Sequence, residues 1–159
     1  TRMVTLANVY EKFGEVSEAA QLLETELGTM LFTHECLDAD LIRNPDSAKA
    51  SEIVQKVNKH TLGRLISALK AKQKDSAVSA EMLETALRAR NFLSHSFYRY
   101  HNFRRNSSKG RELMLNDLER LHNEILAAYL ALLSASGIDI DGQIASGGNS
   151  QLPTRWVKI

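Results

Sequence analysis

The sequence predicts an all-α protein: an antiparallel bundle of four to five helices over residues 1–137, followed by an irregular tail. In two long stretches, apolar residues recur every three or four positions, which is the period of one face of an α-helix. No stretch before residue 138 shows the alternating pattern of a strand. Each apolar seam needs a partner, and antiparallel helices joined by short loops supply one.

The first helix is expected over residues 4–33. Its seam has spacings of 4, 3, 4, 3, 4 and 3 residues and comprises Val9, Phe13, Val16, Ala20, Leu23, Leu27 and Met30. Asn44-Pro45-Asp46-Ser47 indicates a turn and the start of a second helical region, which runs to about Lys74. Gly63 is expected to bend or divide that region. Its inward residues are predicted to be Ile53, Val57, Leu62, Leu65, Ile66 and Leu69.

A third helix is expected from Ser79, a typical N-cap residue, to about His101, followed by a polar connection over 102–109. The fourth helix repeats the seam of the first and is expected to end at Gly137. Its seam comprises Met114, Leu118, Leu121, Ile125, Ala128 and Leu132. The composition then changes to Gly, Asp, Asn and Ser, which predicts an irregular Gly-rich tail over 138–159.

The composition bounds the class of protein. A chain of 159 residues fits one domain with a real core, and its net charge is +1. Residues 1–60 hold 6 Lys or Arg against 10 Asp or Glu, whereas residues 61–159 hold 14 against 9. The basic half favours an anionic partner. The single cysteine excludes an internal disulfide and fits a reducing compartment. No membrane-length apolar run and no secretory signal are recognised, so a cytoplasmic location is expected.

Residues 88–111, here called the basic-aromatic segment, are the most informative part of the chain. They contain seven Arg or Lys and no Asp or Glu, and they hold five of the ten aromatic residues. Cations attract phosphate and aromatic rings stack on unpaired bases, so this mixture suits an RNA-like partner. The alternative is a helix whose aromatics face the core and whose arginines are solvated.

The geometry of the third helix places its polar residues on different sides. At about 100° per residue, an apolar face forms from Met82, Leu83, Ala86, Ala89, Leu93, Phe97 and Tyr100. Arg90 lies within the edge of that face, and Asn91 lies one turn before His95 on the adjoining flank. Arg90 and His95 diverge by about 140°, so one helix does not easily aim both at a single atom. Two copies of the helix facing each other in a symmetric dimer would do so.

Arg90, Asn91 and His95 resemble the signature of HEPN domains, in which Arg, a polar residue and His lie near the end of the penultimate long helix of an all-α bundle. The resemblance covers roughly residues 4–136 and is closest to small toxins of the MNT–HEPN type. Those toxins commonly have Tyr two residues after the His, where this chain has Phe97 followed by Tyr98.

The resemblance implies a metal-independent endoribonuclease, active as a homodimer, with no cofactor and no membrane. His95 is expected to move the proton of a ribose 2′-hydroxyl or of the leaving 5′-oxygen, and Arg90 to hold the scissile phosphate. Asn91 is expected to orient His95 or the phosphate. The expected RNA-binding residues are Arg88, Ser94, Tyr98, Arg99, Arg104 and Arg105. In a toxin–antitoxin setting, a nucleotidyltransferase-type antitoxin is the expected partner.

Other interpretations remain open at this point. A HEPN-like dimer without catalysis would bind a nucleotide, nucleic acid or a partner protein, and a purely structural helical dimer would leave the basic-aromatic segment unexplained. The cluster His34-Glu35-Cys36, Asp38 and Asp40 contains metal-ligand types, but it fits a solvated helix end better because no second His or Cys cluster completes a four-ligand set. The remaining histidines, His60, His101 and His122, are expected on the surface.

Overall fold

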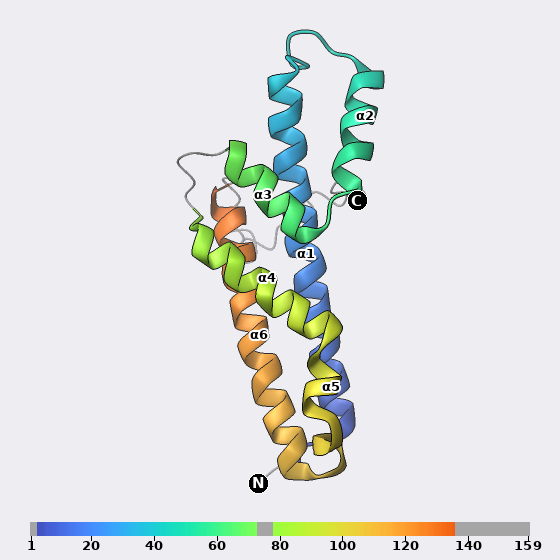
Figure 1. Cartoon of the computed structure of the whole chain (residues 1–159), viewed down its shortest axis with the longest axis vertical. Coiled ribbons are helices and arrows are strands. Elements are labelled where there is room, and N and C mark those ends of the chain that lie inside the picture. The colour runs from blue at the N-terminus through green and yellow to red at the C-terminus, as the bar shows by residue number, and fades with distance from the viewer. Residues whose placement is uncertain (1–2, 73–77, 136–159) are drawn as a thin grey trace, which may run out of the picture. The chain divides into compact units, whose positions relative to one another are not determined.

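The structure is a computed structural model that describes residues 3–72 and 78–135, and its regular elements in these ranges are all helical (Figure 1). They are α1 (Leu6–Asp38), α2 (Ser47–Asn58), α3 (Leu62–Lys72), α4 (Ala80–His95), α5 (Phe97–His101), the 3-10 helix η1 (Asn102–Asn106) and α6 (Ser108–Ala135). The all-α prediction is confirmed. No helix in the described ranges is long and apolar enough to cross a membrane. The predicted tail over 138–159 lies outside the described residues.

The helices are more numerous than predicted because two predicted helical regions each divide. The second region breaks between Asn58 and Leu62, and Gly63 lies inside α3 instead of at the break. The Thr61 hydroxyl there accepts the Arg64 amide hydrogen at 3.4 Å, which marks the start of α3. The third region breaks at Ser96, which leaves the helical conformation with φ −132° and ψ −19°.

Side-chain hydrogen bonds define where the other long helices begin. Thr5 and Asn8 bond reciprocally ahead of α1: the Thr5 hydroxyl accepts from the Asn8 amide, and the Asn8 side chain accepts from the Thr5 amide. Asp46 accepts the Lys49 amide hydrogen at 3.0 Å at the start of α2. These caps satisfy amide groups that the first turn of a helix leaves without a carbonyl partner.

The chain forms two compact units. Among the described residues, the first comprises 3–23 and 80–129, and the second comprises 24–72, 78–79 and 130–135. The helices α1 and α6 each continue from one unit into the other. The basic-aromatic segment belongs entirely to the first unit, which is therefore the one that matters for the candidate site.

The predicted seams form the cores of these units. All six seam residues of α6 are buried, each at most 2% exposed, and the predicted inward residues of α2 and α3 are buried as well. On α1 five of the seven predicted seam residues are buried, whereas Phe13 and Met30 are half-buried and the neighbouring Leu31 is buried. The prediction for Tyr100 was wrong: it is 62% exposed, because the break at Ser96 gives α5 a different register from α4.

Within the first unit, α1 and α6 run in the same direction. Arg111 Nε donates to the Val4 carbonyl at 2.7 Å, and further along both helices Lys12 Nζ lies 3.0 Å from His122 Nδ1. The return pass is made by α4 and α5, where Phe97 packs on Phe13 of α1. Three passes of alternating direction thus bring the two long seams side by side.

A tight corner formed by η1 joins α5 to α6 and contains residues 102–106 of the basic-aromatic segment. Asn102 begins η1 with φ +41°, a left-handed conformation that asparagine tolerates. Gly110 of α6 lies against the backbone of Arg104: a Cβ at Gly110 would stand 2.0 Å from the Arg104 carbonyl oxygen. Position 110 is therefore restricted to glycine by close backbone approach, although it lies inside a helix.

Gly14 of α1 and Gly110 of α6 give a matched pair of substitutions. We expect Gly110→Ala to destabilise the protein by about 1–3 kcal/mol, because the new methyl group forces the η1 backbone away from α6. We expect Gly14→Ala, where nothing lies within 4 Å, to stabilise it by about 0.5–1 kcal/mol, as in an ordinary helix interior. Urea unfolding of both variants measures the difference. Equal stabilisation by both would contradict the close packing of this corner.

Candidate functional site

Arg90 and Asn91, two of the three predicted catalytic residues, are in direct contact. Arg90 is half-buried on α4, and its Nη1 donates to Asn91 Oδ1 at 3.1 Å. Asn91 is exposed. The side-chain oxygen of Asn91 thus accepts from Arg90. The sequence had left open whether Asn91 orients the histidine or the phosphate.

His95, the third predicted catalytic residue, is the last residue of α4 and is exposed. Within the described ranges, no hydrogen bond joins its ring to Arg90 or Asn91. Its carbonyl oxygen accepts a hydrogen bond from Arg99 Nη2 at 2.8 Å, which places a cation at the C-terminal end of α4, where the helix dipole favours positive charge. One protomer therefore presents an arginine–asparagine pair and a separate, accessible histidine.

The remaining arginines of the predicted set donate to uncharged acceptors. On α4, Arg88 Nη2 donates to Thr85 Oγ1 at 3.2 Å. On η1, Arg105 Nη2 donates to the Tyr10 hydroxyl at 3.1 Å, and Arg104 Nη1 lies 3.1 Å from His101 Nδ1.

These contacts leave positive charge uncompensated. Among the described residues, none of Arg88, Arg99, Arg104 and Arg105 forms an ion pair with a carboxylate, and all four are exposed. In the same unit, Arg120 behaves differently, since it pairs with Asp117 at 2.7 Å and with Glu124 at 3.0 Å. Asp117 of α6 does contact the basic-aromatic segment, but it meets the ring of His101, with Nε2 at 2.9 Å from Oδ2, and not one of these four arginines.

The aromatic residues of the segment divide into packed and exposed rings. Phe97 is buried, whereas Tyr100 and Phe103 are 62% and 77% exposed. Tyr98 is 41% exposed and packs on Tyr10 and Phe13 of α1. Both expectations for the segment are therefore partly correct: some rings enter the core and others remain available for stacking. Ser94, from the predicted RNA-binding set, is exposed on α4.

The environment of Tyr98 keeps its hydroxyl protonated. Burial raises the pKa of the Tyr98 phenol; the neighbouring Tyr10 raises it further, and Arg105 opposes the shift. A phenol with a raised pKa donates a hydrogen bond at neutral pH and does not act as a base.

The prediction that His101 lies on the surface was wrong, because it is only 3% exposed. Its Nε2 lies 2.9 Å from Asp117 Oδ2, and its ring packs on Phe97 with the ring centroids 4.6 Å apart. A signal for this was present in the sequence: His101 follows the apolar Phe97 by four residues, so it shares the inward face of a helix.

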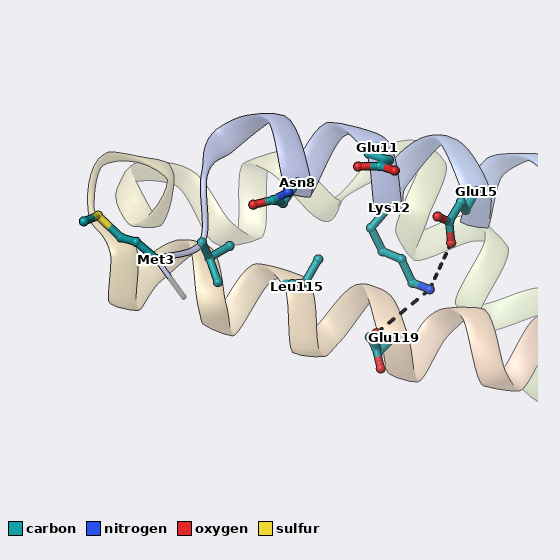
Figure 2. A pocket seen from close by; sticks show the side chains of 8 residues that line it. Met3, Asn8, Glu11, Lys12, Glu15, Leu115 and Glu119 are labelled. Atoms are coloured by element: carbon teal, nitrogen blue, oxygen red, sulfur yellow. Dashed lines mark hydrogen bonds and ion pairs between the residues drawn. The ribbon is translucent and has the colours of Figure 1, made fainter. Parts of the chain in front are cut away.

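A hollow of about 350 Å³ in the first unit lies between α1 and α6, and none of the predicted site residues lines it (Figure 2). Its walls comprise Met3, Val4, Asn8, Glu11, Lys12, Glu15, Leu115 and Glu119. Figure 2 shows Lys12 reaching between two of the carboxylates; its Nζ lies 3.1 Å from Glu15 and 4.0 Å from Glu119. Three carboxylates against one ammonium group repel phosphate, so the hollow does not suit an RNA backbone.

His122 lies beside this hollow and is half-buried. Burial lowers the pKa of its ring, and the adjacent Lys12 lowers it further, whereas Glu15 and Glu119 act in the opposite direction. Lysine only donates, so the 3.0 Å contact with Lys12 Nζ makes His122 Nδ1 the acceptor and places the ring hydrogen of the neutral form on Nε2.

In the second unit, α1 continues to Asp38, beyond the predicted end at residue 33. Two of the metal-ligand types near this end are engaged in ion pairs: Lys72 of α3 pairs with Glu35 at 3.4 Å and with Asp38. Burial raises the pKa of the Cys36 thiol, and Glu35 raises it further. In residues 3–72 and 78–135, no group of three or more His, Cys, Asp or Glu side chains is placed to hold a metal ion.

Comparison of the chain with protein-family models, curated proteins and solved structures found no match. The resemblance of Arg90, Asn91 and His95 to the HEPN signature therefore stays a prediction from those residues.

The lowered pKa of His122 predicts a loss of stability in acid. The unfolded chain takes up a proton near the ordinary value of 6.5, whereas the folded ring resists it, so the free energy of unfolding falls as pH falls from about 7.5 to 5.5. We expect His122→Asn, which keeps a neutral acceptor for Lys12, to lose less stability over this range. Thermal unfolding at both pH values measures the difference, and identical losses in the variant and the unchanged protein would contradict it.

Proposed function

We propose that this protein is an RNA-binding helical bundle of the HEPN type that cleaves RNA without a metal ion. The observation that carries the proposal is the set of exposed guanidinium groups, at Arg88, Arg99, Arg104 and Arg105, that donate to uncharged acceptors and pair with no carboxylate among the described residues. Each retains its full charge for a phosphate backbone.

The exposed aromatic rings indicate which form of RNA the protein would bind. Tyr100 and Phe103 extend from the corner that also carries Arg104 and Arg105. Aromatic faces stack on bases only where those bases are unpaired, so the combination favours single-stranded RNA over a duplex.

The proposed chemistry is an internal transesterification. The ribose 2′-oxygen attacks the adjacent phosphorus, the bond from phosphorus to the 5′-oxygen breaks, and the product carries a 2′,3′-cyclic phosphate. His95 takes the 2′-hydroxyl proton or gives a proton to the 5′-oxygen. Arg90, held by Asn91 at 3.1 Å, stabilises the charge that develops on the phosphate oxygens.

The proposed active form is a homodimer. Arg90 and His95 lie on one helix, α4, and five residues at about 100° each make their positions diverge by about 140°, so a second copy would bring an arginine and a histidine to one phosphate. A nucleotidyltransferase-type antitoxin is the partner that fits a toxin of this kind.

The same separation of Arg90 from His95 favours a second function. A protein that binds single-stranded RNA, a nucleotide or a partner protein through the basic-aromatic segment, without cleavage, needs no composite site. The two proposed functions therefore differ in two testable respects. Cleavage requires the dimer and depends on His95, whereas binding alone requires neither.

The composite site requires a symmetric dimer. Sedimentation equilibrium is expected to give about twice the chain mass of 17.8 kDa at micromolar concentration. A strict monomer at tens of micromolar would remove the composite mechanism and leave the binding function.

Substitutions separate catalysis from binding. We expect His95→Ala to lower the rate of RNA cleavage by roughly 10²–10⁴-fold, the range of a lost acid–base group, while RNA affinity persists. Arg90→Ala is expected to abolish cleavage, whereas Arg105→Ala mainly weakens binding and its salt dependence. Lys49→Ala is the charge-matched control, because Lys49 lies on α2 and pairs with Glu52 at 3.6 Å. Gel assays of cleavage and fluorescence anisotropy measure the two effects.

Two conditions test the chemistry directly. Cleavage should continue in EDTA, since no metal takes part, and it should fail on a strand with 2′-hydrogen in place of 2′-hydroxyl. Cleavage that stops on chelation would contradict the mechanism. Tight RNA binding without cleavage, whether or not His95 is present, would decide for the binding function.

A further inference from the structure

A buried histidine and a carboxylate lie directly behind Arg104. His101 of α5 is 3% exposed, its Nε2 lies 2.9 Å from Asp117 Oδ2 on α6, and its Nδ1 lies 3.1 Å from Arg104 Nη1. The ring is fixed from its sides by Phe97 and Tyr100, whose centroids lie 4.6 and 5.1 Å away. The imidazole therefore connects the body of α6 to an exposed guanidinium group.

The donor and acceptor roles in this network follow from its two ends. A guanidinium group only donates, so His101 Nδ1 accepts, and a carboxylate only accepts, so Nε2 carries the hydrogen. Asp117 is itself fixed, because Arg120 donates to its other oxygen from Nε at 3.1 Å and from Nη2 at 2.7 Å. Asp117 Oδ2 thus remains directed at His101.

Arg104 is held from two directions while its charge stays accessible. Its guanidinium carbon lies 5.3 Å from the centroid of the Tyr100 ring, and Nη1 is bound to His101. A cation over an aromatic face is attracted by the ring, and the guanidinium group has five N–H donors, of which His101 takes one. The other donors can bind a phosphate oxygen.

We infer that Asp117 and His101 position Arg104, which with Tyr100 forms a preorganised subsite for one phosphodiester of single-stranded RNA. The inference rests on the proposed function and assigns this subsite within the basic-aromatic segment. An arginine loses side-chain entropy when it binds a phosphate, and an arginine that is already ordered loses less. His101 and Asp117 do not touch the RNA and act only through Arg104.

A double-mutant cycle on RNA affinity tests the inference. The probe is a short single-stranded RNA with methylated 2′-hydroxyls, which binds but is not cleaved, and affinity is measured by fluorescence anisotropy over a range of salt. Arg104→Ala should weaken binding and reduce the slope of log affinity against log salt by about 0.7, the value for one phosphate contact. His101→Phe should weaken binding by about two- to tenfold with the slope unchanged, because the charge remains.

In the Arg104→Ala background, His101→Phe should have no further effect on RNA affinity. An equal loss in both backgrounds would show that His101 acts through general stability and would overturn the inference. An unchanged affinity in Arg104→Ala, while the unchanged protein binds RNA, would overturn the subsite and leave the proposed function standing. A protein that binds no RNA would overturn both.

Two further variants guard against misfolding of His101→Phe. In His101→Asn, the side-chain oxygen falls near the place of Nδ1 and accepts from Arg104, but the side chain does not reach Asp117. His101→Gln places its amide nitrogen near Nε2 and keeps the bond to Asp117. We expect Asn to retain more RNA affinity and Gln to retain more thermal stability; the same order in both measurements would overturn the positioning role.

Discussion

The corner between α5 and α6 depends on one close backbone contact. The carbonyl group of Arg104 lies where a Cβ at Gly110 would be, so η1 packs directly against the start of α6. This contact brings His101 within hydrogen-bond distance of Asp117 and buries its ring against Phe97. Ser107 completes the corner by accepting the Gly110 amide hydrogen at 3.0 Å, which caps α6. A larger residue at position 110 would push η1 away from α6 and would disturb the contacts of His101 with Asp117 and Phe97 at the same time.

The corner also determines the electrostatic character of the first unit. Two other cations of that unit are neutralised: Arg120 pairs with two carboxylates, and Lys12 lies between Glu15 and Glu119. The arginines of the corner bond to a histidine ring and a tyrosine hydroxyl, which fix the guanidinium groups without cancelling their charge. The charge of +1 for the whole chain therefore conceals a local excess of positive charge.

The contrast between Arg90 and His95 limits what one protomer can do. Arg90 is half-buried and bonded to Asn91, whereas His95 ends α4 and is exposed. In the proposed mechanism, binding would need a single copy, whereas catalysis would need a second copy to bring an arginine and a histidine to one phosphate. The proposed enzyme and the proposed binding protein thus share one surface and differ in assembly.

The sequence by itself determined the helical class and most of the core, because a seam such as Met114 to Leu132 follows the helical period whatever packs against it. It also located the acid-free segment, since charge content is a local property. Only the tertiary structure decided which rings are exposed and which groups the buried histidine contacts. The break at Ser96 changed the register of α5, so Tyr100 turned outward, and the carboxylate that His101 contacts comes from Asp117, sixteen residues away on another helix. Such pairings arise from the way the chain folds back on itself, which helical periodicity does not encode.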